Sequence, residues 1–246
     1  SMAQARASMV VHQMLDRMEH RGPDGREVVS TSWSTIGAVQ LEVMGRAEVL
    51  AEESRRRPKS VLAQTVTGGT ILGLNGQVYN HDELGLDVGR PRAHGGASVD
   101  TQRVLSHYDA QGIAGLVDLR GEFSIAISDD RSRTVHLVRD PFGTRPLYWA
   151  RSHGGIAFAS EANALLALTD VSSTWDALSL AKFLAVRAVP GDRTIYSDIH
   201  LVRAGAATSI TSDGARTVTP LWNLATEMRK RTSADLSAAI SAAIEA

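Results

Sequence analysis

The chain has 246 residues, of which 43% are hydrophobic and 22% charged, the composition of a globular protein with a sizeable buried core. Its formal net charge of −1 excludes a bulk electrostatic attraction to nucleic acid or anionic membranes, and the absence of cysteine excludes disulfides, thiolate metal sites and a cysteine nucleophile within these residues. No apolar run approaches the roughly 18 residues that span a bilayer and no signal-peptide pattern opens the chain, so we expect a cytoplasmic protein.

The first predicted element is a helix over Met9–Met18, because the apolar residues of "MVVHQMLDRM" fall on one helical face. Ser1-Met2 resembles an expression scar, and we interpret residues 1–8 as a tag or leader remnant. The stretch "HRGPDG" from His20 ends the helix, since its glycines and proline cannot continue it.

Short β-type segments separated by turn residues dominate the middle of the chain, which predicts antiparallel pairing. The predicted strands are Glu27–Ser32, Thr35–Val43, Ser60–Val66, Gly69–Leu74, Gln77–Asn80, Phe123–Asp129, Thr134–Arg139, Leu147–Arg151, Ile156–Ser160, Thr194–Tyr196 and Ala206–Ile210. Asn75-Gly76 lies between two of these strands and is a strong hairpin signal, because both residues tolerate positive φ.

Helical segments interrupt the strands and also end the chain. The predicted helices within the domain are Asp100–Gln111, Glu161–Leu168 and Trp175–Val186. Beyond residue 222 the sequence becomes alanine-rich with a narrow apolar stripe. We interpret residues 223–246 as a linker and the start of a helix leading to a further domain, with the boundary near residues 220–232.

Seven stretches occur in the order found in one protein family. They are "HRGPDG" from His20, "LNGQVYN" from Leu74, "VDTQRVL" from Val99, "LRGEFSIAISD" from Leu119, "LVRDPFGTRPLYW" from Leu137, "IAFASEANALL" from Ile156 and "VPGDRTIYSDI" from Val189. Over residues 9–222 the chain thus resembles the class II glutamine amidotransferase domain of asparagine synthetases and β-lactam synthetases. The resemblance implies an α+β N-terminal-nucleophile (Ntn) hydrolase fold, a four-layer αββα sandwich of two antiparallel sheets between helices.

The resemblance also implies a set of site residues. Active relatives attack glutamine with an N-terminal cysteine whose own α-amine is the base, and an Asn-Gly pair stabilises the oxyanion. Asn75 and Gly76 match that pair, and Asp100 matches an aspartate that binds the glutamine ammonium, although it is an equally good helix N-cap. Gln77, however, replaces a glutamate, and Gln40 replaces the arginine that binds the glutamine carboxylate. We expect oxyanion-hole equivalents and a vestigial glutamine pocket without a catalytic residue.

These departures shape the predicted function. Ser1 is a conceivable nucleophile, but the short and irregular lead before the first helix favours a tag remnant. We predict a degenerate, glutaminase-inactive domain with a scaffolding role in an asparagine-synthetase-like ATP-dependent ligase or cyclase of natural product biosynthesis. Two alternatives stay open: a glutamine-hydrolysing asparagine synthetase whose N-terminal cysteine strand is missing from these residues, and a small-molecule-sensing or interaction module.

Cofactors and partners follow from the same reading. Histidines without ligand spacing predict no metal site, and no stretch matches the pyrophosphate loop of a synthetase domain, so we expect no cofactor in this chain. The resemblance implies ATP and magnesium in a missing synthetase domain, in the same or a separate chain, and a homodimer is a further candidate. His20, Arg21, Asp140 and Arg145 are interpreted as structural, and Glu161 as an acid at a helix N-terminus.

Overall fold

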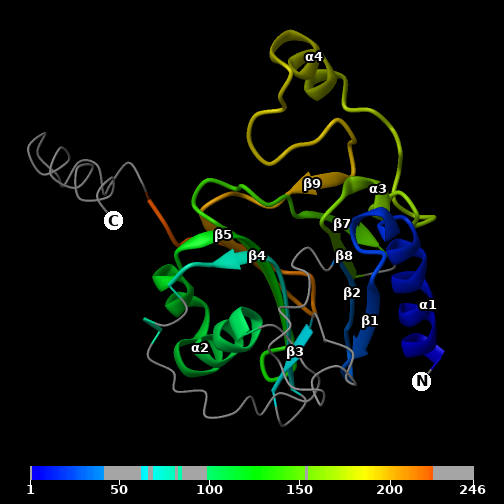
Figure 1. The fold of residues 1–246 in the computed structure, drawn as a ribbon. Coiled ribbons are helices and arrows are strands. Elements are labelled where there is room, and N and C mark those ends of the chain that lie inside the picture. The colour runs from blue at the N-terminus through cyan, green and yellow to red at the C-terminus, as the bar shows by residue number, and fades with distance from the viewer. Residues whose placement is uncertain are drawn as a thin grey trace, which may run out of the picture.

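In the computed structural model of this protein, the described residues are 2–41, 62–65, 69–80, 83–84, 99–152 and 155–223. Their elements form four layers in the order helix, sheet, sheet and helix, which Figure 1 shows from α2 on one side to α1 on the other. All pairs of named strands are antiparallel. The predicted αββα sandwich is confirmed, with the difference that the second sheet layer consists of two small sheets.

The first sheet layer has six strands in the order β11-β10-β6-β5-β4-β3. They are β3 (Leu62–Gln64), β4 (Thr70–Val78), β5 (Gly121–Asp129), β6 (Thr134–Arg139), β10 (Ala206–Thr211) and β11 (Arg216–Pro220). Helix α2 (Val99–Gly115) covers one face, where Val104 and Leu105 pack in one apolar cluster with Leu72 and Phe123. A short 3-10 turn, η3 (Leu116–Asp118), then leads into β5.

The second sheet layer packs against the other face of the six-stranded sheet. It contains β1 (Gly25–Ser30) paired with β2 (Thr35–Gln40), and β8 (Gly155–Ala159), β7 (Tyr148–Ser152) and β9 (Ile199–Leu201) in the order β8-β7-β9. Between the layers, Leu137 and Ile210 share a buried cluster with Trp149 of β7. Helices α1 (Met2–Asp16) and α3 (Ala162–Leu165) cover the outer face, with the 3-10 turn η1 (Glu19–Arg21) after α1.

The largest departure from the predicted elements lies in β4. The sequence predicted two strands joined by a turn at Asn75-Gly76, but Thr70–Val78 is one continuous strand that pairs with β5 along its whole length. The hairpin prediction was wrong because the positive φ of Gly76 is used inside a strand, where it brings two backbones close together, and not in a turn.

Other elements differ at their ends. Helix α1 begins at Met2 and not at Met9, and the regular part of α2 ends near the predicted Gln111, because Gly112 has a positive φ of 65°. No strand forms at the predicted Thr194–Tyr196, and β9 lies just after it. The predicted segment 223–246 falls, apart from Asn223, outside the described residues.

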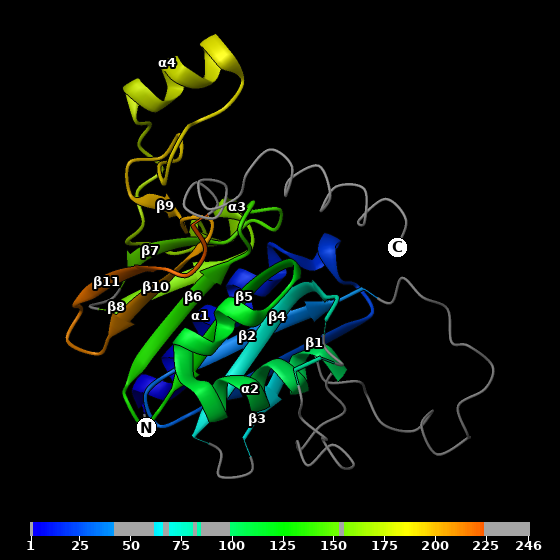
Figure 2. The same ribbon diagram turned by 90° about the vertical axis from the view of Figure 1, so that its left-hand side faces the viewer.

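Helix α4 (Ala177–Val186) projects away from the layered body, as Figures 1 and 2 show. It begins where the Asp176 carboxylate accepts a hydrogen bond from the Ser179 backbone N–H at 2.7 Å, and it ends at Arg187 in the left-handed conformation. Its apolar side chains are largely exposed, with Leu184 at 74%.

Within the described ranges, no helix combines the length and apolar character that a bilayer crossing requires.

Candidate functional site

The predicted site residues of β4 lie on the face of the six-stranded sheet that looks toward the second sheet layer. Side chains alternate along a strand, and Leu72 and Val78 belong to the cluster under α2. Asn75 and Gln77 therefore face the other way, the same way as Ile71, which packs against β2. The register with β5 places Ser124 opposite Asn75. This puts the two predicted residues on the same face of β4, where Asn75 is partly buried and Gln77 is exposed near the end of the strand.

Gly76 lets β4 keep its pairing with β5 at this point. Its φ is 127°, and a Cβ atom built there would lie 1.9 Å from the carbonyl oxygen of Glu122. No side chain fits so close to a backbone, and L-residues rarely adopt that φ. Glycine is therefore required by the strand itself.

Asn75 carries the most informative polar atom of the site. Its amide nitrogen Nδ2 is inaccessible to solvent and has no hydrogen-bond partner among the described residues. A buried donor without a partner costs about 1–3 kcal/mol, and in a native structure it calls for an explanation in function or bound ligand. A donor of this kind, beside a glycine with its own backbone N–H, is what an oxyanion hole requires.

Asp100 lies beside the end of β4. Its carboxylate oxygen Oδ2 accepts a hydrogen bond from the backbone N–H of Val78 at 3.2 Å. Because α2 begins at Val99, Asp100 is inside the first helical turn, where a negative charge is favoured by the helix dipole, and it is not the N-cap that the sequence suggested. The structure thus brings Asp100 to the strand that carries Asn75 and Gln77.

Gln40 lies at the end of β2, in the second sheet layer. Its backbone carbonyl accepts a hydrogen bond from the Asp24 N–H at 3.0 Å, so it holds the "HRGPDG" turn in place. A Cβ atom at Gly22 would lie 2.4 Å from the Gln40 nitrogen, which shows how tightly that turn packs on the strand. Within the described ranges, no hydrogen bond joins the Gln40 side chain to Asn75 or Gln77.

Two charged residues beside the site were not assigned to it from the sequence. Glu122 of β5 lies directly opposite Gln77, and its carboxylate is 3.4 Å from Nη2 of Arg145. Nε of Arg145 is buried and without a hydrogen-bond partner among the described residues. The only sequence signal was the alternation in "LRGEFSIAISD", which puts Glu122 and Ser124 on one face but does not say which strand they meet.

The turn after α1 is held by an acid from a distant part of the chain. Glu161 was expected to act at a helix N-terminus, but its side chain makes no capping hydrogen bond. Its carboxylate instead lies 3.0 Å from His20 Nε2 and 3.1 Å from Arg21 Nη1. The helix-end interpretation was therefore incomplete, and all three side chains tie the turn to α3.

Asp140 organises the "RDPFG" turn after β6. Its fully buried carboxylate accepts hydrogen bonds from the Phe142 and Thr144 backbone N–H groups, both at 2.9 Å, and from the Thr144 hydroxyl at 2.6 Å. Arg139 donates from its guanidinium to the carbonyls of Gly143, Arg145 and Val202, and burial lowers its pKa. These contacts agree with a structural role for the turn.

The described residues contain no group of three histidines or acids placed to hold a metal ion. Ser1 lies outside the described residues. The described residues around Asn75 offer amide and backbone donors, the Asp100 carboxylate and the Glu122–Arg145 pair, a set of groups able to bind a polar ligand.

Comparison with known proteins agrees with this geometry. The profile of a family described as "Glutamine amidotransferase domain" matches residues 2–222. A putative glutamine-hydrolysing asparagine synthetase of Mycobacterium tuberculosis is 29% identical over 219 residues, which are 85% of this chain and 32% of the relative. Asparagine synthetase 3 of Bacillus subtilis is 27% identical, covering 87% of this chain and 34% of the relative.

Solved structures support the fold. Glutamine phosphoribosylpyrophosphate amidotransferase of B. subtilis matches with a TM-score of 0.55 and 17% identity, over 87% of this chain and 46% of that one. An allosteric regulatory enzyme of purine biosynthesis matches with a TM-score of 0.57 and 18% identity, over the same shares. The chain spans about a third of the length of the curated relatives. Since the profile covers nearly all of it, the chain belongs to the class II glutamine amidotransferase domain family and has the Ntn-hydrolase fold.

Proposed function

We propose that this chain is a glutaminase-inactive amidotransferase domain that serves as a scaffold for an asparagine-synthetase-like, ATP-dependent ligase or cyclase. The observation that carries the proposal is the composition of the pocket. Asn75 and Gly76 keep the donors for an oxyanion, while Gln77 and Gln40 replace the two charges that would bind the ends of glutamine. Each lost charge-assisted hydrogen bond weakens binding by about 1.5–3 kcal/mol.

The nearby charges do not replace the lost ones. Glu122 lies opposite Gln77 but is engaged by Arg145, and the Asp100 carboxylate accepts a backbone hydrogen bond from β4. The 246 residues also contain no cysteine that could supply a thiolate. Amide formation in such a system uses an amine from the substrate, as in enzymes of natural product biosynthesis, and needs no ammonia from glutamine.

The scaffolding role rests on helix α4. Leu178, Leu184 and Val186 expose 56%, 74% and 63% of their surface on an element that stands clear of the layered body (Figure 2). Exposed apolar surface of this kind marks protein–protein contact. We assign it to a synthetase unit that would bind ATP and magnesium, for which the uncovered two thirds of the curated relatives leave room. That unit is supplied in the same or a separate cytoplasmic chain.

A glutaminase assay on the purified chain tests the proposal. We expect no glutamate release above a Ser1 deletion variant, at glutamine concentrations far above those that saturate active relatives. Turnover that disappears on deletion of Ser1 would overturn it. The docking role is tested by copurifying the synthetase unit with the wild-type chain and with Leu184→Ser. Met9→Ser on α1, which alters a comparably exposed apolar residue, is the control. Equal recovery with all three chains would exclude docking through α4.

A second candidate function is the sensing of a small molecule in the old pocket. It is favoured by the partnerless Nδ2 of Asn75, since a ligand carbonyl is the natural acceptor for it. Calorimetric titration with glutamine, glutamate and asparagine separates this candidate from pure scaffolding, because a scaffold binds none of them.

A further inference from the structure

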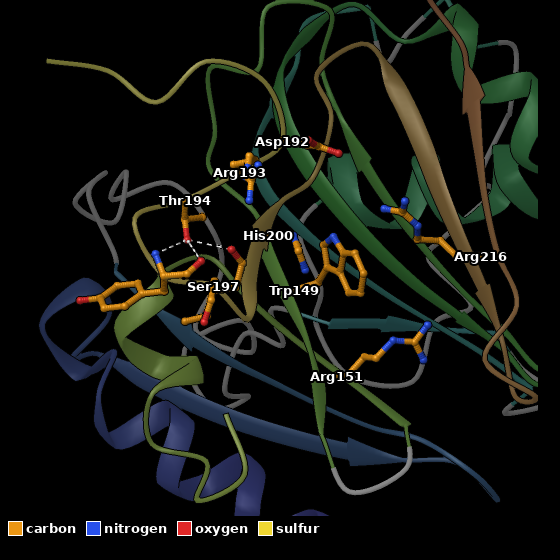
Figure 3. Close-up of a pocket in the computed structure, with 10 residues that line it drawn as sticks. Trp149, Arg151, Asp192, Arg193, Thr194, Ser197, His200 and Arg216 are labelled. Carbon is orange, nitrogen blue, oxygen red and sulfur yellow. Dashed lines mark hydrogen bonds between the residues drawn. The ribbon is translucent and has the colours of Figure 1, made fainter. Parts of the chain in front are cut away.

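A concave site lies away from Asn75 and the other predicted site residues. It has a volume of about 400 Å³ and opens where the β7-β9 sheet meets the strand β11 of the six-stranded sheet (Figure 3). Trp149 and Arg151 come from β7, His200 from β9 and Arg216 from β11, and the segment 192–197 closes the rim. None of its lining residues is among the predicted amidotransferase site residues. The volume is in the range of sites for small molecules.

The lining is rich in arginine. Arg193 is already paired, since its Nη2 lies 2.5 Å from Oδ2 of Asp176. Arg151 and Arg216, in contrast, have no carboxylate partner and donate no hydrogen bond within the described part of the chain. Asp192 is the single acid among the lining residues. Two guanidinium groups with free donors therefore border one cavity.

Aromatic contacts fix the position of one of these groups. The Arg216 guanidinium lies over the Trp149 ring, with its central carbon 5.2 Å from the ring centroid. The His200 ring packs against the same indole at 4.8 Å between centroids. A guanidinium held by a cation–π contact keeps its fork of donors available and loses less freedom on binding.

His200 adds a neutral donor. Burial lowers its pKa, and the nearby Arg216 and Arg193 lower it further against the opposite effect of Asp192 and Asp198. The lowered pKa favours the neutral imidazole, which presents one N–H. The hydroxyls of Thr194 and Ser197 are already donated, to the Ile199 carbonyl and to Asp198, so they are not counted as free donors.

We propose that this cavity binds a small phosphate-bearing anion, with Arg151 and Arg216 as its two cationic anchors. Both guanidinium forks border the same cavity, and the geometry of such a fork matches the several equivalent oxygens of a phosphate dianion. The cavity has room for a substituent beyond the phosphate. Inorganic phosphate, pyrophosphate and nucleoside monophosphates all carry the phosphate group that the two arginines would bind.

Calorimetric titration of the purified chain with these three compounds, at fixed ionic strength, tests the inference. We expect at least one of them to bind, and both Arg151→Gln and Arg216→Gln to weaken its binding at least about tenfold, the effect of losing a charge-assisted hydrogen bond. Arg17→Gln removes an exposed arginine outside the cavity and is the matched control, for which we expect less than about a twofold change. Circular dichroism of each variant verifies that folding is unchanged.

Three results would overturn the phosphate proposal. No binding by any of the three compounds at millimolar concentration would overturn the inference. So would binding that Arg17→Gln weakens as much as Arg151→Gln, because it would reflect the general surface charge. Succinate, a dicarboxylate, is the specificity control, and tighter binding of succinate than of every phosphate compound would refute the phosphate assignment. Arg151→Lys keeps the charge but loses the fork, and we expect it to bind more weakly than the wild type.

Discussion

Gln77 of β4 lies directly opposite Glu122 of β5, on the face of the sheet that looks into the space between the layers. Side chains at such positions have Cβ atoms about 4.5–5.5 Å apart. The sequence thus lacks the glutamate that the family has at the position of Gln77. The carboxylate of Glu122 lies on the neighbouring strand and pairs with Arg145. Restoring the family residue would place two acids side by side.

Gln77→Glu is therefore expected to destabilise the fold, by about 0.2–1 kcal/mol, because like charges opposite each other repel. Urea unfolding at neutral pH and low salt measures the change in the free energy of unfolding. Glu122→Gln in the same chain removes the repulsion and is expected to recover most of the loss. A double-mutant cycle with no coupling between positions 77 and 122 would show that the two side chains do not interact.

Asn75→Ala is expected to leave the free energy of unfolding unchanged or to raise it by up to about 1 kcal/mol, since it removes a buried donor that has no partner. Asn80→Ala is the matched control. Its side chain donates to the Asp118 carbonyl and accepts from the Arg120 N–H, both at 2.8 Å, so we expect a loss of about 1–3 kcal/mol. Equal losses in the two variants, measured by denaturant unfolding, would mean that Asn75 has a structural partner after all.

Gly76→Ala is expected to cost more than about 3 kcal/mol, since the new methyl group would collide with the β5 backbone at a φ of 127°. Gly191→Ala provides the comparison, because Gly191 also has a positive φ but nothing lies within 4 Å of its Cβ position. There only the backbone strain applies, about 1–2 kcal/mol. Similar thermal midpoints for the two variants would contradict the close approach.

Asp140→Asn is expected to lower the free energy of unfolding by about 2–4 kcal/mol, because an amide nitrogen replaces an acceptor that receives several hydrogen bonds in a fully buried place. Asp130→Asn changes the neighbouring acid of the β5–β6 turn, which accepts one long hydrogen bond from Ser32, and should cost less than about 1 kcal/mol. Chemical unfolding of both variants provides the measurement, and a milder effect at position 140 would argue against its turn-organising role.

Burial lowers the pKa of His136, with Asp129 acting in the opposite direction. The folded protein therefore binds this proton less readily than the unfolded chain, where histidine titrates near 6.5. The stability associated with the neutral ring is present above about pH 6.5 and is lost as the pH falls through the lowered pKa. We expect His136→Gln to flatten the decline in unfolding free energy between pH 7.5 and 5, as measured by urea unfolding at a series of pH values, and an unchanged slope would contradict this role of the buried ring.

Many of the strands and helices could be predicted because neighbouring residues in the sequence determine where they begin and end. Strand β6 was predicted with its observed ends, Thr134 and Arg139, since a run of β-formers lies between turn residues. Strand β11 was missed because Arg216–Pro220 contains a single large apolar side chain, Val218. The strand lies at the edge of the six-stranded sheet, and most of its residues are exposed. Its pairing with β10 depends on a contact that periodicity does not report.

The site was predictable only in part. Family resemblance pointed to Asn75, Gly76 and Asp100, and the structure places all three at β4 or beside it. The position of Glu122 could not be predicted, because the facing of β5 depends on its register with β4. The cavity lined by Arg151 and Arg216 had no sequence signal, since the two residues are far apart in the chain and line one cavity only because the three-stranded sheet lies beside β11.

The close approach of β4 and β5 at Gly76 has a consequence for how such domains change over time. A substitution at this glycine would break the sheet before it affected any reaction, so selection for folding alone preserves it. The side chains that carry the glutamine-binding charges are not required for folding, so they can be substituted once glutamine is no longer a substrate. The glycine of an Asn-Gly pair in a relative therefore reports on the fold, and the residue after it is more informative about glutaminase activity.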